Sequence, residues 1–182
     1  MNTRRLLPLS ILLASSVAAT SIAQADGPAS PSPMVEKVRA ATAAFRDHKA
    51  ALAAGYVDTG NCVSNRDGAA MGVHFVRPDL LGDGMLDVNT PEILVYEPLP
   101  GGRMQLVAVE YIMFDDGDPF TGSPVLEGQL LNYSGAPNRY GLPAYHELHV
   151  WAWKRNPMGT FADWHPNVSC DAYAGPSGMG GH

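Results

Sequence analysis

The sequence is poor in positive charge. Its 182 residues include 12 Lys and Arg against 18 Asp and Glu, which gives a formal net charge of −6 at pH 7. Proteins that bind nucleic acid carry a basic patch or stripe, and no window of this chain holds one. Anionic lipid surfaces select basic segments in the same way. We therefore expect no nucleic-acid partner and no binding to anionic membranes.

Several enzyme motifs are absent as well. The chain has no GxSxG nucleophile motif, no phosphate-cradling glycine loop followed by Lys-Ser or Lys-Thr, and no dinucleotide fingerprint. The acidic run 115–118 lacks the later ligands and the closing Glu of a calcium loop, so we interpret it as a solvated turn. These absences argue against the usual hydrolase, kinase and dehydrogenase sites.

Long apolar runs are scarce, and the main one lies near the N-terminus. Arg4 and Arg5 precede an apolar stretch at 6–19, and 23–25 is Ala-Gln-Ala, a pattern typical of a signal-peptidase site. A membrane-spanning helix needs about 20 apolar residues, and no positively charged stop follows this shorter run. We predict a cleavable signal at 1–25, no membrane anchor after cleavage, and a periplasmic or secreted location. The arginine pair leaves twin-arginine export open beside the ordinary route.

Cysteine is also rare. The chain has two cysteines, Cys62 and Cys170, and no CxxC motif. In an oxidising compartment a lone pair of cysteines usually forms a structural disulfide, so we predict that these two residues are bonded. A catalytic or metal-bound thiolate is the alternative, and no second thiol lies nearby in sequence to support it.

The rest of the chain is long enough for one domain. Residues 26–33 are rich in Pro, Ser, Ala and Gly and predict a flexible leader, whereas the Gly-rich residues 172–182 predict a disordered tail. Residues 34–171 form the predicted globular domain. Apolar residues recur at three- and four-residue steps over 33–54, which predicts one helix that Ser32 can cap.

Strand signals dominate after Cys62. Runs rich in β-branched and aromatic residues alternate with Gly and Pro turn clusters, and one of these clusters, at 100–102, is short enough to close a hairpin. The predicted strands are 71–76, 92–97, 103–114, a short one near 125–131, and 145–154. One helix followed by such strands predicts an α+β domain. We expect the N-terminal helix to pack on an antiparallel β-sheet or half-barrel, closed by one disulfide.

Six segments carry a resemblance to a known group of proteins. They are GVHFVRP (72–78), LVYEP (94–98), VEY (109–111), LHVWAW (148–153), NPMGTFA (156–162) and NVSC (167–170). In these segments the sequence resembles a family of small exported bacterial proteins of uncharacterised function, and the resemblance extends over nearly all the mature chain. The resemblance implies export, a shared fold and the same pair of cysteines, and it carries over no catalytic residue.

The last predicted strand suggests a binding surface. Alternation along 145–154 sends Glu147, His149 and Trp151 to one face. Residues two apart on a strand lie about 6.5 to 7 Å apart, so Glu147 and His149 could converge on one ion. Trp151, followed by Trp153, would extend the face as an aromatic wall. The pattern predicts a pocket on the sheet face, with Glu147 and Trp151 as ligand-binding residues.

Two further residues could join this face. His74 lies in an otherwise apolar strand, and alternation places Glu110 in a core-facing register, where an unpaired charge would cost several kcal/mol. With His149 they make a set of two histidines and one carboxylate, the minimum for zinc, copper or iron with an open coordination position. The alternative is a Glu110–His149 pair that needs no metal. His165, in a predicted turn near Cys170, is a reserve candidate.

Three functions remain open from the sequence. The first is an exported small-ligand or metal-binding protein with a pocket on the sheet face. The second is a structural or protein-interaction module of the cell envelope without a metal. The third is a metal-dependent enzyme that uses the same residues.

Overall fold

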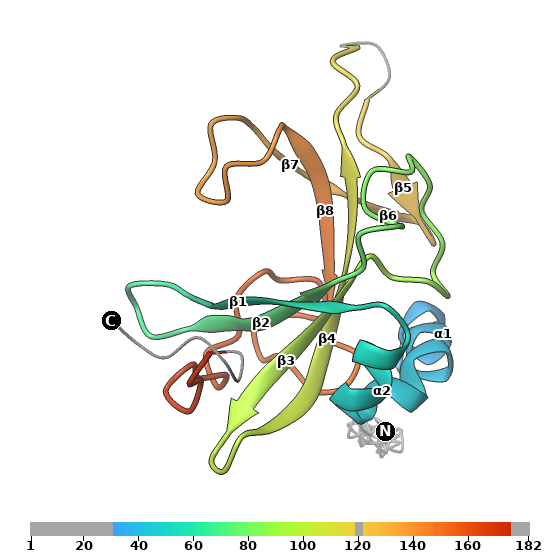
Figure 1. Ribbon diagram of the computed structural model, residues 1–182. Coiled ribbons are helices and arrows are strands. Elements are labelled where there is room, and N and C mark those ends of the chain that lie inside the picture. Colours follow the sequence, from blue (N-terminus) through green and yellow to red (C-terminus); the bar gives the residue numbers. More distant parts are fainter. Residues whose placement is uncertain (1–30, 119–121, 176–182) are drawn as a thin grey trace, which may run out of the picture. The chain divides into compact units, whose positions relative to one another are not determined.

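The structure, a computed structural model, describes residues 31–118 and 122–175 (Figure 1). The predicted signal at 1–25, most of the predicted leader and the end of the predicted tail lie outside the described residues. Within the described ranges, no helix is both long enough and apolar enough to cross a membrane.

A six-stranded sheet forms the centre of the domain, and every neighbouring pair of strands in it is antiparallel. The strand order is β1-β2-β3-β4-β8-β7, so β1 and β7 are the edges. The bounds are Val57–Ser64 (β1), Ala70–Val76 (β2), Ile93–Leu99 (β3), Arg103–Phe114 (β4), Asn132–Ser134 (β7) and Tyr145–Val150 (β8). A separate small hairpin pairs β5 (Val125–Leu126) with β6 (Gln129–Leu130). The predicted α+β class, with an antiparallel sheet and one disulfide, is confirmed.

The helical part differs from the prediction. One helix was expected over 33–54, but the chain forms α1 (Pro33–Thr42), the 3-10 turn η1 (Ala43–Arg46) and α2 (His48–Ala53). Ser32 caps α1 as predicted, accepting a hydrogen bond from the Val35 N–H at 3.4 Å. The Asp47 side chain caps the start of α2 by accepting a hydrogen bond from the Lys49 N–H at 3.0 Å. The prediction of one continuous helix is wrong because this second cap interrupts it.

Strand alternation divides the apolar side chains between the two faces of the sheet. The helical residues Val35 and Val38 pack in one cluster with Phe75, Tyr96 and Tyr111. The opposite face carries a second cluster of side chains, which includes Ile93, Val95, Ala108, Ile112 and Trp151. The helices therefore cover one face of the sheet and leave the other face available for a binding site.

The end of β8 departs from the prediction of a strand over 145–154. Pairing of Val95 with Ala108 and of Tyr96 with Leu106 leaves Val107 as an extra residue in β4. Beyond β8, the Val107 carbonyl accepts hydrogen bonds from the N–H groups of both Trp153 and Lys154. Regular pairing stops at this bulge, and β8 ends at Val150.

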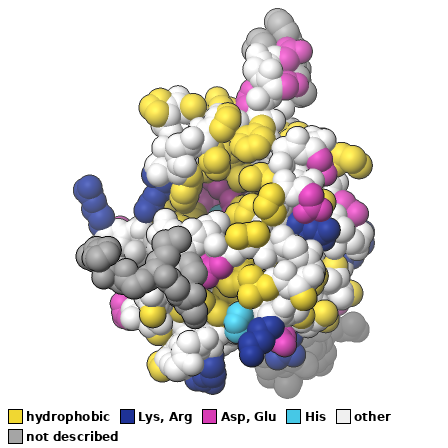
Figure 2. All heavy atoms as spheres, viewed as in Figure 1, with side chains coloured by type: hydrophobic (Ala, Val, Ile, Leu, Met, Phe, Trp, Pro, Cys, Tyr) yellow, Lys and Arg dark blue, Asp and Glu magenta, His cyan; other side chains and the backbone are white. Residues whose placement is uncertain are grey.

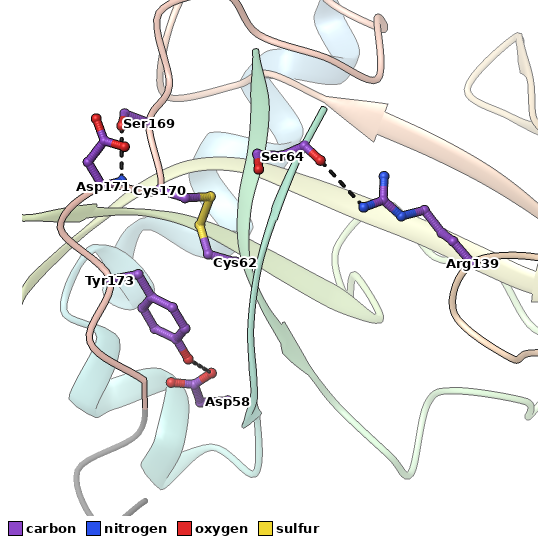
Figure 3. The surroundings of a disulfide bond; sticks show 8 residues. All are labelled: Asp58, Cys62, Ser64, Arg139, Ser169, Cys170, Asp171 and Tyr173. Atoms are coloured by element: carbon purple, nitrogen blue, oxygen red, sulfur yellow. Dashed lines mark hydrogen bonds between the residues drawn. A yellow bond between two sulfur atoms is a disulfide. The ribbon is translucent and has the colours of Figure 1, made fainter. Parts of the chain in front are cut away.

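The disulfide joins Cys62 on β1 to Cys170 near the C-terminal end, with Cα atoms 5.7 Å apart (Figure 3). It closes a loop of 108 residues, for which chain entropy gives an upper value of about 4.7 kcal/mol. Tyr173, from the segment predicted as a tail, is among the described residues and donates a hydrogen bond to Asp58 at 2.9 Å (Figure 3). The disulfide and the Tyr173–Asp58 hydrogen bond hold the C-terminal segment against β1.

Glu92 gives the fold a measurable pH dependence. It is 2% exposed and accepts a hydrogen bond from the Ile112 N–H at 3.2 Å. Burial raises the pKa of Glu92 from 4.5 to about 7. Between these two values the folded protein keeps a proton that the unfolded chain loses, so this group's contribution to the free energy of unfolding falls as pH rises.

We therefore expect Glu92→Gln to gain stability relative to the wild type between about pH 5 and pH 8, by about 3 kcal/mol at most. Urea unfolding of both proteins across this range measures the difference. A difference that stays constant with pH would contradict the assignment.

Candidate metal centre

His74, Glu110 and His149 come from three strands and share one face of the sheet. His74 alternates with Val73 and Phe75 of the helix-side cluster, and Glu110 and His149 alternate in the same way with residues of that cluster. Glu110 and His149 lie directly opposite each other in the β4–β8 pair. The three side chains therefore project from the face opposite the helices.

His74 reaches this site across an intervening strand. It lies on β2, whereas Glu110 lies on β4, and β3 runs between them. β2 approaches β3 closely at Gly72, where an added Cβ would be 2.5 Å from the Tyr96 carbonyl oxygen. The His74 Nε2 atom lies 3.4 Å from Glu110 Oε2.

The three ligand atoms form a compact group. His149 Nε2 lies 3.8 Å from Glu110 Oε2, and the two imidazole rings are nearly perpendicular, with centroids 6.1 Å apart. All three potential ligand atoms lie within 4.8 Å of one another. Around a tetrahedral zinc with bonds of about 2.0 to 2.1 Å, ligand atoms are about 3.4 Å apart. A small inward movement of the side chains would complete such a geometry.

His149 is the most constrained member of the group. Its side chain is fully buried, and neither ring nitrogen has a hydrogen-bond partner among the described residues. The Nδ1 atom lies 3.9 Å from Asp163 Oδ1, which also accepts no hydrogen bond there. Buried polar atoms are nearly always paired, so this arrangement requires an explanation.

The histidines are neutral at pH 7. Burial lowers the pKa of His74 from 6.5 to about 4. Burial, together with the proximity of His74, lowers the pKa of His149 to about 3. Neutral imidazole is the form that coordinates a metal, so both rings are in the ligating state without loss of a proton.

Two carboxyl groups meet beside the histidines. Burial raises the pKa of Glu110 well above its ordinary value, and the neighbouring Glu147 raises it further. Glu147 is half-buried, and its own pKa is also raised by burial. Like charges disfavour each other's ionisation, so the pair retains a proton more readily than separate carboxyls would. A bound cation would relieve this repulsion.

A cavity of about 290 Å³ opens onto His74 and Glu110. Its other lining residues are Thr59, Asn61, Val63, Val76, Leu81, Ile93, Ile112, Tyr140, Leu142 and Tyr145. Figure 2 shows a hollow rimmed by hydrophobic side chains, with acidic side chains at its floor. His74 and Glu110 can therefore be approached from outside through an apolar pocket.

The tryptophans do not form the wall of this cavity. Trp151 is buried in the core, where its indole N–H donates to the Ala162 carbonyl and its ring packs against His165 with centroids 4.7 Å apart. Trp153 lies beyond the bulge, and its indole N–H donates to Thr42 at 3.0 Å on the helix side. Aromatic lining comes instead from Tyr140 and Tyr145.

His165 has a structural role. Its Nδ1 accepts a hydrogen bond from the Asn167 N–H at 3.0 Å, which requires the proton to be on Nε2. Nε2 lies 3.1 Å from the Arg155 carbonyl, to which it donates. Both nitrogens are used, so this residue has no free nitrogen for a metal.

Two residues near the site have no sequence signal that could have identified them. Asp163 lies in an irregular segment after β8, and Tyr140 lies in the loop between β7 and β8. Neither segment has a periodic pattern that fixes which way a side chain faces. Their placement depends on long-range packing of loops.

No protein-family model, no curated protein and no solved structure matches this chain. The function must therefore be argued from the geometry of the site.

The unpaired imidazole of His149 leads to a test without any metal. Replacing it by Leu, an apolar residue of similar volume, removes two buried polar atoms that lack partners. We expect metal-free His149→Leu to be as stable as the wild type or more stable by about 1 to 2 kcal/mol, measured by urea unfolding. If His149 belonged to a hydrogen-bonded structural core, the same change would lower stability.

Proposed function

We propose that this protein is an exported metal-binding protein. It binds one transition-metal ion through Nε2 of His74, Nε2 of His149 and the carboxylate of Glu110. The observation that carries the proposal is the fully buried His149, whose Nε2 has no hydrogen bond and lies 3.8 Å from Glu110 Oε2. A metal ion between these atoms supplies the missing partner, because the nitrogen lone pair becomes a metal bond.

The donor set favours zinc, with copper and iron as alternatives. Two imidazoles and one carboxylate are a common ligand set for catalytic and exchangeable zinc, which keeps its fourth position for water or a ligand. The ligand atoms lie within 4.8 Å of one another and must move closer together to share one ion. Zinc has no geometric preference from d electrons, so it accepts the bond angles that the three side chains then impose. The fourth position would face the cavity, which His74 and Glu110 line.

Asp163 provides the outer partner that such a site needs. Metal-binding histidines almost always donate their second ring N–H to a carboxylate, a carbonyl or water. His149 Nδ1 faces Asp163 Oδ1 at 3.9 Å, and neither atom has another hydrogen bond. A shift of less than 1 Å would make this contact a hydrogen bond and fix the tautomer that places the lone pair on Nε2.

Export is the second half of the proposal. It rests on the signal pattern predicted at 1–25 and on the disulfide between Cys62 and Cys170, which suits an oxidising compartment. The resemblance to small exported bacterial proteins stays a prediction.

The direct test is a zinc titration of the metal-free protein by calorimetry. We expect one zinc per chain, and about a 100-fold loss of affinity or more in His149→Ala. His146→Ala is the matched control, because His146 is also buried on β8 and lies 3.3 Å from a carboxylate, that of Asp115. The control should keep the wild-type affinity. Equal losses in the two variants, or no saturable binding by the wild type, would contradict the proposal.

Asp163 can be tested separately as a positioning residue. Asp163→Asn keeps the shape of the side chain and removes its charge, so we expect zinc affinity to fall about tenfold, at the lower end of outer-partner effects. Competition with a chromogenic chelator measures this change. Asp171→Asn, an exposed position outside the site, is the control. Unchanged affinity in Asp163→Asn would show that His149 is oriented without this carboxylate.

A further inference from the structure

The cavity above the candidate metal centre has mostly apolar walls. Its aliphatic residues are Val63, Val76, Leu81, Ile93, Ile112 and Leu142. The volume, about 290 Å³, is roughly twice that of an engineered cavity of about 150 Å³ that binds benzene. It therefore suits the body of a small hydrophobic molecule with about ten non-hydrogen atoms.

The floor of the cavity is polar, in contrast to its walls. His74 and Glu110 are its two residues that can coordinate a metal. Glu147 and Asp163 do not line the cavity, but Glu147 lies two residues from His149 on β8, and Asp163 Oδ1 lies 3.9 Å from His149 Nδ1. Without a metal this floor offers an anion no cationic group among the described lining residues. A divalent cation with an open position changes this, because it offers a direct bond to an anionic oxygen.

Arg139 is a cationic residue beside the lining residue Tyr140, and its charge points to the same class of ligand. Arg139 precedes Tyr140, and its guanidinium lies 5.7 Å from the centre of that ring. It also donates a hydrogen bond to the Ser64 carbonyl on β1 at 3.4 Å (Figure 3). Arg139 thus joins the β7–β8 loop to the edge strand, both of which line the cavity. Its positive charge favours the approach of anions.

We propose that the cavity binds a small apolar monocarboxylate, whose carboxylate coordinates the metal held by His74, Glu110 and His149 and whose hydrocarbon body fills the apolar walls. This inference rests on the proposed metal-binding function and names the ligand class of the same site. Among the described lining residues there is no Lys or Arg, so the metal supplies the positive charge that pairs with an anion at the floor. Binding of the carboxylate therefore requires the metal.

The probes are benzoate and benzyl alcohol, which share a ring and differ in the charge and coordinating power of the head group. Zinc affinity is measured first by calorimetry in the absence of either probe. Each probe is then titrated into zinc-loaded and zinc-free protein. We expect benzoate to bind the zinc-loaded form about tenfold tighter than benzyl alcohol, or more. We expect no measurable benzoate binding without zinc.

Two variants test the position of the hydrocarbon body. Leu142→Trp, in the β7–β8 loop, and Leu81→Trp, in a turn, each place a large ring in the cavity from a half-buried position outside the sheet. Each folded variant should lose about tenfold or more in benzoate affinity and keep zinc affinity within about twofold. Using both variants guards against one that fails to fold.

The two proposals can fail separately. No zinc binding in the first titration overturns the metal-binding function together with this inference. Zinc binding without benzoate binding overturns the inference alone. Equal affinity for benzoate and benzyl alcohol, benzoate binding that survives removal of zinc, or unchanged benzoate affinity in the folded Trp variants also overturns it.

Discussion

The imidazole of His149 has no exposure to solvent and no hydrogen bond at either nitrogen within the described chain. The other features of the site depend on which groups satisfy these two nitrogens. Each unsatisfied polar atom in a protein interior costs about 1 to 3 kcal/mol. Glu110 and Asp163 stand on the two sides of the ring at 3.8 and 3.9 Å, too far for hydrogen bonds. A metal ion on one side and a tightened contact with Asp163 on the other would satisfy both nitrogens together.

The sheet determines where this ring lies. Antiparallel pairing of β4 with β8 sets Glu110 opposite His149, and His74 on β2 reaches the same carboxylate from across β3. The helices cover the opposite face and leave this one to a cavity. The same elements that exclude water from His149 and lower its pKa also keep an opening at Glu110 and His74. This combination of a buried ligand and an accessible face suits a metal with one exchangeable position.

Much of this arrangement was predictable from local patterns. The run 103–114 is long and strongly β-forming, so the sequence predicts its bounds. Period-two alternation places Glu147 and His149 on one face and Glu110 in a core-facing register, and the β4–β8 pairing then brings Glu110 opposite His149. Strand β1 was missed because a register shift between Asp58 and Cys62, which spans the left-handed Gly60, interrupts its alternation. The bulge at Val107 shortened β8 and sent Trp153 to the other face. Loops and bulges of this kind depend on contacts between distant segments, which no local window encodes.

Anomalous diffraction at the zinc edge from crystals of the zinc-loaded protein tests the central claim most directly. The account predicts one strong peak at about 2.0 to 2.2 Å from Nε2 of His74, Nε2 of His149 and a carboxylate oxygen of Glu110. It also predicts that Asp163 moves to within hydrogen-bonding distance of His149 Nδ1. A zinc-loaded crystal without a peak among these three residues, or with its zinc at the acidic run 115–118 instead, would contradict the account.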